Sequence, residues 1–156
     1  MKKARIKTPL GIAEITGDQE GLASINVLDS GDISEEIPEE LAPAAKQLQA
    51  YFEGKLQNFD LRLNPKGTDF QKKVWEELQQ IPYGTTTSYL ELSRQLGDEK
   101  AIRAVASANG KNPLWIVIPC HRVIGSDGSL TGYAGGLHRK KWLLELENPP
   151  SQQSLF

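Results

Sequence analysis

The chain is organised around one stretch, Leu114-Trp115-Ile116-Val117-Ile118-Pro119-Cys120-His121-Arg122-Val123. Its first five residues are all apolar, and such a run predicts a buried strand. Pro119 is expected to end the strand, because proline has no N–H to donate to a neighbouring strand. Cys120, the only cysteine of the chain, would therefore emerge at the end of a core strand, beside an imidazole and a guanidinium.

Two interpretations of this cysteine stand open from the residues alone. A thiolate is the nucleophilic form of cysteine, and cationic or hydrogen-bonding neighbours lower a thiol pKa toward neutrality. A lone cysteine is, however, more often a buried apolar side chain than a nucleophile. The local sequence permits a nucleophile without requiring one.

Length and composition narrow the class of protein. With 156 residues, 38% of them hydrophobic, the chain can form one domain of ordinary size or two small ones. No stretch approaches the roughly 18 apolar residues of a membrane span, and no apolar segment follows the basic N-terminus as in a signal peptide. A single cysteine excludes an intrachain disulfide and a cysteine-rich zinc site, so we expect a reduced, cytoplasmic protein.

The charges are unevenly distributed along the chain. The net charge of −2 argues against a strongly basic nucleic-acid-binding protein. Residues 1–65 nevertheless carry a balance of −4, and residues 66–156 a balance of +2. The stretch 94–141 carries 8 Lys and Arg against 3 Asp and Glu. Such a basic stretch can contact phosphates, although an ordinary solvated surface explains the same distribution equally well.

The sequence pattern of residues 1–65 predicts a small antiparallel sheet with one helix. Runs rich in apolar residues at 4–7, 12–15 and 22–28 are separated by turn residues, as in three consecutive strands. A helix with one apolar face is expected over 38–54, and alternation over 58–63 indicates a further strand. Nothing in this part has a catalytic pattern.

The pattern becomes helical after residue 66. Thr68 can cap a helix that places Phe70, Val74 and Leu78 on one face. Two short helices, about 89–96 and 100–109, are joined by a turn with a glycine and form the pattern of a helix-turn-helix. Close helix packing explains a short helix pair as well. A last helix is expected over about 137–147.

Pro119-Cys120-His121-Arg122-Val123 resembles the corresponding motif of the O6-alkylguanine-DNA alkyltransferases, which repair O6-methylguanine in DNA. The similarity extends over roughly 68–147. It includes the tyrosine of the first short helix, the arginine of the second, the Asn-Pro before the apolar run, the Tyr-x-Gly-Gly loop and the terminal Leu-Glu. The resemblance implies an α+β fold with a ribonuclease-H-like α/β domain over 1–65. A helical domain with a winged-helix-like helix-turn-helix would cover 66–148, and a flexible tail 149–156.

The resemblance also implies the reacting groups. Cys120 would be the nucleophile and alkyl acceptor, His121 would take its proton through a water, and Glu147 would orient the imidazolium. Asn112 would fix the cysteine loop by hydrogen bonds. Tyr89 would donate a proton or hydrogen bond to the guanine as its O6 becomes a leaving group.

Further residues are implied in contacts with DNA. The target base must leave the stack, and Arg103 matches the arginine that fills the vacated space while its helix enters the minor groove of double-stranded DNA. The other implied DNA contacts are Arg94, Lys100, Ala104, Lys111 and Arg122, with surface solubility as an equal alternative for the lysines and Arg94. The base pocket would include Tyr133, Ala134, Val123 and Lys140, where Ala134 replaces a serine common in the family.

The resemblance implies a reaction that happens once, because the alkylated cysteine is a thioether with no ready hydrolytic route. Acceptance of O4-alkylthymine stays open. We expect a monomer without cofactor or metal, since the chain has only two histidines besides the single cysteine. The rivals are a Cys-His hydrolase, a non-catalytic reader of alkylated DNA and a helix-turn-helix regulator, none of which explains all of the matched residues.

The tail suggests a separate partner. Gln152-Gln153-Ser154-Leu155-Phe156 resembles the peptide by which bacterial repair proteins bind the sliding clamp, although Gln153 stands where that peptide has leucine. A polar tail that ends in two apolar residues by chance is the alternative. When bound to DNA, the protein would be associated with the nucleoid.

Overall fold

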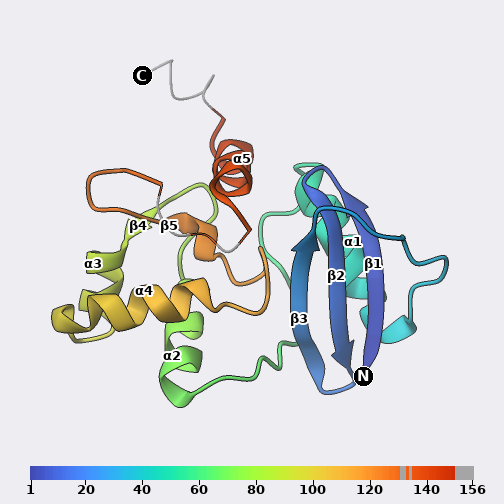
Figure 1. Ribbon diagram of the computed structural model, residues 1–156, viewed down its shortest axis with the longest axis horizontal. Helices are drawn as coiled ribbons and strands as arrows, with labels where there is room; N and C mark the ends of the chain where they lie inside the picture. Colours follow the sequence, from blue (N-terminus) through green and yellow to red (C-terminus); the bar gives the residue numbers. More distant parts are fainter. Residues whose placement is uncertain (131–132, 134, 150–156) are drawn as a thin grey trace. The chain divides into compact units, whose positions relative to one another are not determined.

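The computed structural model divides into two compact units (Figure 1). The first comprises Met1–Lys66 together with Pro113–Trp115, and the second comprises Gly67–Asn112 together with the chain from Ile116 onward. The structure describes residues 1–130, 133 and 135–149. Within these residues, no helix is long and apolar enough to cross a membrane.

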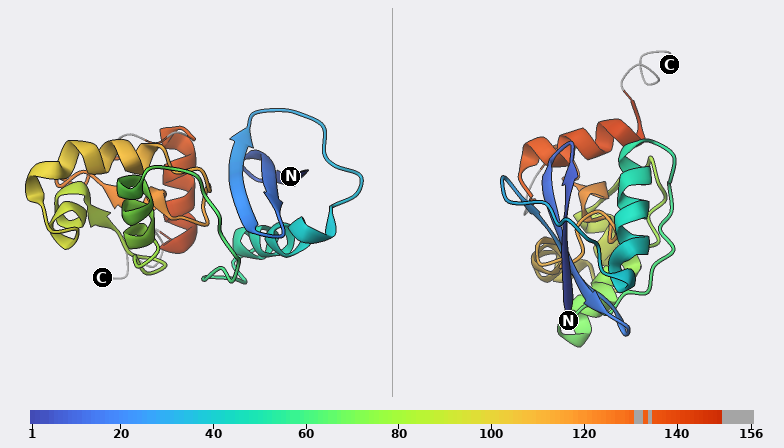
Figure 2. Two further views of the ribbon diagram at one scale, coloured as in Figure 1. Left: turned by 90° about the horizontal axis from the view of Figure 1, so that it is seen from below. Right: turned by 90° about the vertical axis from the view of Figure 1, so that its right-hand side faces the viewer.

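The first unit is a three-stranded antiparallel sheet with one helix against it (Figure 2). The strands β1 (Lys2–Thr8), β2 (Gly11–Asp18) and β3 (Gly21–Leu28) pair in the order β1-β2-β3, which confirms the predicted meander. A 3₁₀ turn, η1 (Glu39–Leu41), leads into α1 (Ala42–Phe52). The core forms because alternate strand residues and one helix face are apolar, and its buried members include Ile6, Ile15, Ile25, Leu48 and Tyr51.

The strand predicted over 58–63 is wrong. Only Leu63 pairs with the sheet, through an isolated parallel bridge to Leu22. The Leu22 N–H donates to the Arg62 carbonyl at 2.9 Å, and the Asn64 N–H donates to the Leu22 carbonyl at 2.8 Å. The alternation of apolar and polar residues over 58–63 therefore belongs to a segment that pairs with the edge of the sheet at one residue only.

The buried strand predicted over 114–118 is also wrong. Leu114 alone makes an isolated bridge, to Ile25 of β3, and the chain then turns. Ile116 has a φ of 71°, a conformation that costs a β-branched residue about 1–3 kcal/mol. All five residues are buried. An apolar run reports burial, and burial does not distinguish a strand from a buried turn.

The second unit begins with α2 (Asp69–Leu78). Thr68 caps it as predicted: the Gln71 N–H donates to Thr68 Oγ1 at 3.1 Å, and the Thr68 N–H donates to Gln71 Oε1 at 3.0 Å. The placement of Phe70 on the buried face is wrong, because its side chain is 39% exposed. Trp75 is buried instead, and its indole N–H donates to the Ala108 carbonyl at 2.9 Å.

The predicted helix-turn-helix is present (Figure 1). Its first helix is α3 (Tyr89–Gln95), whose N-cap Ser88 accepts a hydrogen bond from the Glu91 N–H. Gly97, at a φ of 93°, ends the following turn. A 3₁₀ turn, η2 (Glu99–Ala101), then leads into the second helix, α4 (Ile102–Gly110).

Three short elements and a last helix complete the described part of this unit. The cysteine lies in a 3₁₀ turn, η3 (Cys120–Arg122), followed directly by β5 (Val123–Ile124), which pairs in parallel with β4 (Thr87–Ser88). The last helix is α5 (Leu137–Glu147). The two units together confirm the predicted α+β class.

Candidate active site

The Cys120 side chain is held in η3 by the Asn112 amide. Asn112 Nδ2 donates to the Ile118 carbonyl at 2.7 Å and to Cys120 Sγ at 3.2 Å. Asn112 lies two residues after the end of α4, so a single amide joins the end of this helix to the cysteine turn. The expectation that Asn112 bonds the cysteine loop agrees with this geometry.

The thiol is buried, and burial raises the pKa of Cys120 above its usual value. The hydrogen bond from Asn112 and the positive charge of Lys140 both act in the opposite direction. Burial is the largest of these causes, so the neighbours do not bring the pKa of this thiol below its usual value. The sulfur therefore needs a base to become a thiolate.

His121 is placed as such a base. Its Nε2 lies 2.7 Å from Glu147 Oε2 in a buried pair. Burial alone would raise the pKa of Glu147, but hydrogen bonds from His121 and Arg122 lower it to about 2. An ionised carboxylate only accepts, so Nε2 carries the proton and Nδ1 keeps its lone pair. Nδ1 is buried and has no hydrogen-bond partner within the described part of the chain.

Burial also lowers the pKa of His121 below its usual value, even though Glu147 acts to raise it. The imidazole is therefore neutral at neutral pH and can accept a proton at Nδ1. A buried nitrogen without a protein partner, here in the residue that follows Cys120, is a site that a bound water can satisfy.

Arg122 lies in the same buried cluster. Its Nε donates to Glu147 Oε1 at 2.8 Å, its Nη2 donates to Glu147 Oε2 at 3.0 Å, and its Nη1 donates to the Ile81 carbonyl at 2.8 Å. The guanidinium also lies 5.6 Å from the ring centroid of Tyr83. The expected DNA contact of Arg122 is therefore corrected, because this side chain is buried against protein groups.

Lys140 is fully buried beside this cluster. Burial lowers its pKa, while the nearby Cys120 acts to raise it. Its Nζ lies 6.0 Å from the ring centroid of Tyr89, the first residue of α3. Lys140 and Tyr89 are thus brought together from α5 and α3, and the Lys140 charge lies near the cysteine.

The remaining predicted DNA contacts lie on the helix-turn-helix. Arg103, Ala104 and Lys111 are exposed on or directly after α4, and Lys100 is exposed in η2. Ser107 and Gly110 are also exposed, so the open face of α4 is formed largely by small residues. Arg94 is exposed as well, but its Nε lies 2.8 Å from Glu99 Oε1.

The predicted base pocket is described only in part. Val123 is buried at the start of β5, and the hydroxyl of Tyr133 is shielded from solvent. Ala134 and the tail motif Gln152-Gln153-Ser154-Leu155-Phe156 lie outside the described residues.

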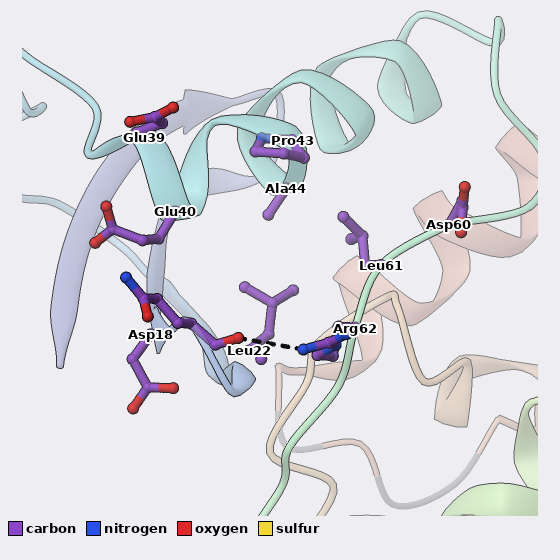
Figure 3. Close-up of a pocket in the computed structure, with 11 residues that line it drawn as sticks. Asp18, Leu22, Glu39, Glu40, Pro43, Ala44, Asp60, Leu61 and Arg62 are labelled. Atoms are coloured by element: carbon purple, nitrogen blue, oxygen red, sulfur yellow. Dashed lines mark hydrogen bonds between the residues drawn. The ribbon is translucent and has the colours of Figure 1, made fainter.

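A separate pocket of about 420 Å³ lies in the first unit, between the β2–β3 turn, the start of α1 and the segment 60–62 (Figure 3). Arg62 Nη1 donates to the Gln19 carbonyl beside it at 3.5 Å. Its lining contains no predicted site residue but four carboxylates, which would repel DNA phosphates: Asp18, Glu39, Glu40 and Asp60.

A buried cysteine, an imidazole held by a carboxylate, and a helix-turn-helix in the same unit define a class of protein: a DNA-binding protein with a cysteine nucleophile. The comparisons with known families name it further. Residues 69–149 match the DNA-binding domain of 6-O-methylguanine DNA methyltransferase, and residues 1–65 match its ribonuclease-like domain. The chain belongs to this family, and the predicted resemblance is confirmed.

Relatives and solved structures agree along nearly the whole chain. The chain is 50% identical over 149 residues to a methylated-DNA–protein-cysteine methyltransferase of Methanosarcina barkeri, covering 91% of this chain and 94% of the relative. Mycobacterium tuberculosis O6-methylguanine methyltransferase has a TM-score of 0.84 at 44% identity, covering 99% of this chain and 98% of that chain. A structure of M. tuberculosis OGT in complex with DNA has a TM-score of 0.83 at 46% identity, covering 92% and 90%.

Proposed function

We propose that this protein repairs DNA by transferring the alkyl group of O6-alkylguanine to the sulfur of Cys120, once per molecule. The observation that carries the proposal is the chain of contacts from Asn112 to Cys120 and from His121 to Glu147, in a unit that also holds a helix-turn-helix. The family and its methyltransferase relatives support the same reaction.

The proposed reaction begins with neutral partners. The thiol proton passes through a water to His121 Nδ1, and Glu147 stabilises the imidazolium that forms. The thiolate attacks the alkyl carbon, a C–S bond forms, and the C–O6 bond breaks with its electron pair on the guanine. Tyr89 donates a hydrogen bond or a proton to the leaving guanine. The imidazolium then gives up the proton that it took from the thiol and becomes neutral again. The net transfer therefore moves the thiol proton to the base.

The proposed reaction ends after one event. A thioester formed by acyl transfer would be hydrolysed, whereas the thioether formed by alkyl transfer has no comparable route to water. Repaired guanines should therefore equal the number of active protein molecules.

This stoichiometry is measured by treating the protein with excess duplex that contains O6-methylguanine and following loss of the modified base. Repair should stop at one base per protein and should be absent in Cys120→Ala. Continued turnover on this substrate, or on an ester, would favour a Cys-His hydrolase instead.

Access to the base requires flipping, which costs a few kcal/mol. We assign this role to Arg103 on the exposed face of α4, where the small neighbours Ala104, Ser107 and Gly110 leave room for close approach to the minor groove. We propose that Lys100 and Lys111, both exposed, contact phosphates, and that Arg94 does so in competition with Glu99.

Arg103→Ala should slow repair of duplex DNA by at least tenfold while leaving attack on a free O6-alkylguanine base nearly unchanged, because the free base needs no flipping. Lys46→Ala, which alters an exposed lysine on α1 outside the DNA-binding unit, is the surface control. Equal loss on duplex and free base would argue against a flipping role for Arg103.

Three finer proposals concern partners and location. The tail Gln152-Gln153-Ser154-Leu155-Phe156 is proposed to bind the sliding clamp on the strength of its sequence alone, and failure of a tail peptide to bind purified clamp would dispose of it. The protein is proposed to act as a monomer. It is proposed to be cytoplasmic and nucleoid-associated, because Cys120 must stay reduced to react.

A further inference from the structure

The Glu147 carboxylate accepts hydrogen bonds from more groups than the proposed reaction uses. His121 Nε2 and Arg122 Nη2 share Oε2, at 2.7 and 3.0 Å, while Arg122 Nε and the Gly84 N–H share Oε1, at 2.8 and 3.3 Å. The side chains are almost inaccessible, at 0% for His121, 7% for Arg122 and 1% for Glu147. The guanidinium is thus part of the site.

The geometry of this contact is specific to arginine. A guanidinium is planar and donates two parallel hydrogen bonds to a carboxylate, so it fixes the plane of the carboxylate as well as its distance. A lysine ammonium at this place would supply charge without the fork. The bond from Arg122 Nη1 to the Ile81 carbonyl anchors the guanidinium on its other side.

We propose that Arg122 is a positioning residue of the alkyl transfer: it clamps Glu147 so that Oε2 faces His121 Nε2 and Nδ1 remains available to the thiol. The proposal rests on the proposed function of Cys120. It replaces the expected role of Arg122 in DNA contact.

The clamp also sets the charge around the imidazole. The groups that face His121 are Glu147 and Lys140 from α5 and Arg122 from η3, and Tyr83 faces the Arg122–Glu147 pair from the turn before β4. With Arg122 present, the carboxylate is already neutralised by a cation. Without it, the carboxylate would stabilise the imidazolium more strongly, which raises the pKa of His121 and lowers the fraction of neutral imidazole at neutral pH.

The test uses single-turnover transfer from a free O6-alkylguanine base, measured from mildly acidic to mildly alkaline pH, so that DNA affinity plays no part. Arg122→Met should react more slowly at neutral pH, by up to about tenfold, and approach the wild-type rate at alkaline pH, because one unit of pKa shift changes the neutral fraction of His121 by up to tenfold. Arg122→Lys should lie between the two.

Arg139→Met is the matched control, since Arg139 is also buried and on α5, but its Nη1 donates to the Gly135 carbonyl. Arg139→Met should keep the dependence of the transfer rate on pH that the wild-type protein has. An equal loss at every pH in Arg122→Met, or a loss seen only with duplex DNA, would overturn the proposal.

A second measurement does not need activity. The titration of the His121 imidazole, followed by NMR, should shift to higher pH in Arg122→Met, which removes the cation, and by less in Arg122→Lys, which keeps a cation in the buried site. An unshifted titration overturns the positioning role even where transfer is slow. If the wild-type Cys120 accepts no alkyl group, the proposed function fails, and this titration still decides whether Arg122 controls His121.

Discussion

Cys120 and His121 are both uncharged in the resting site, because burial raises the pKa of the thiol and lowers that of the imidazole. A thiolate–imidazolium pair is thus formed only as the reaction proceeds. The sequence supplied the reacting residues through a resemblance. It did not supply their charge states, since these depend on burial by segments far apart in the chain.

The same dependence on tertiary structure explains the error at Arg122. An arginine two residues after a cysteine and directly before a short strand has the sequence pattern of a surface cation or of a buried one. Its partners, Glu147 and the Ile81 carbonyl, lie 25 and 41 residues away along the chain. No local pattern identifies such a contact.

The low pKa of Glu147 predicts that the folded state loses stability in acid. Its pKa falls from an ordinary value of 4.5 to about 2 on folding. The folded state therefore gains stability above pH 4.5 that is lost as pH falls from 4.5 toward 2, by about 3 kcal/mol. The free energy of unfolding, measured by denaturant titration at several pH values, should show this decrease.

Glu147→Gln should not show that decrease between these pH values. Glu145→Gln, which alters an exposed carboxylate of the same helix, should retain it. A wild-type protein whose stability is flat over this range would contradict the assignment of a low pKa to Glu147.

At the scale of elements, the helix starts followed from the sequence better than the apolar runs did. Thr68 as a cap and the short helix beginning after residue 88 were predictable, because capping is a local hydrogen bond between a side chain and a nearby N–H. The conformation of residues 114–118 was not predictable, because five consecutive apolar residues indicate burial but do not determine the backbone conformation. Phe70 was misplaced, since Trp75 occupies the buried face of α2.

The two helix caps give a matched pair of variants. Ser88→Ala and Thr68→Ala should each lower the free energy of unfolding by about 1 kcal/mol, because each leaves a helix N–H without its partner. Only Ser88→Ala frays the start of α3, where Tyr89 lies. It should therefore slow repair more than Thr68→Ala does, as measured by single-turnover kinetics after matching the folded fraction.

Equal repair rates in these two variants would contradict the importance of the first turn of α3. A larger loss in Thr68→Ala would contradict it more strongly.

At the scale of the whole molecule, the uneven charge distribution agrees with the roles of the two family domains. The balance of −4 lies in residues 1–65, matched by the ribonuclease-like domain, and the exposed cations Lys100, Arg103 and Lys111 lie in the DNA-binding domain. The segment Pro113–Trp115 shows what sequence could not predict. It joins the first unit through the Ile25 backbone, with bonds of 2.8 and 3.1 Å.

The charge distribution predicts how DNA affinity depends on salt. Each phosphate contact releases counterions, so the logarithm of the affinity should fall linearly with the logarithm of salt concentration. Lys111→Gln should reduce that slope by about 1. Lys46→Gln, which alters an exposed lysine on α1, should leave the slope unchanged. A reduced slope for Lys46→Gln would indicate that the first unit contacts DNA, which contradicts the prediction.

Mass spectrometry of the intact protein shows directly whether Cys120 is a single-use alkyl acceptor. After reaction with excess duplex O6-methylguanine, the intact chain should gain the mass of one CH₂ group, with none gained by Cys120→Ala. Peptide mapping should place that group on Cys120. Loss of O6-methylguanine from the DNA with an unmodified protein, or a methyl group on another residue, would contradict the claim.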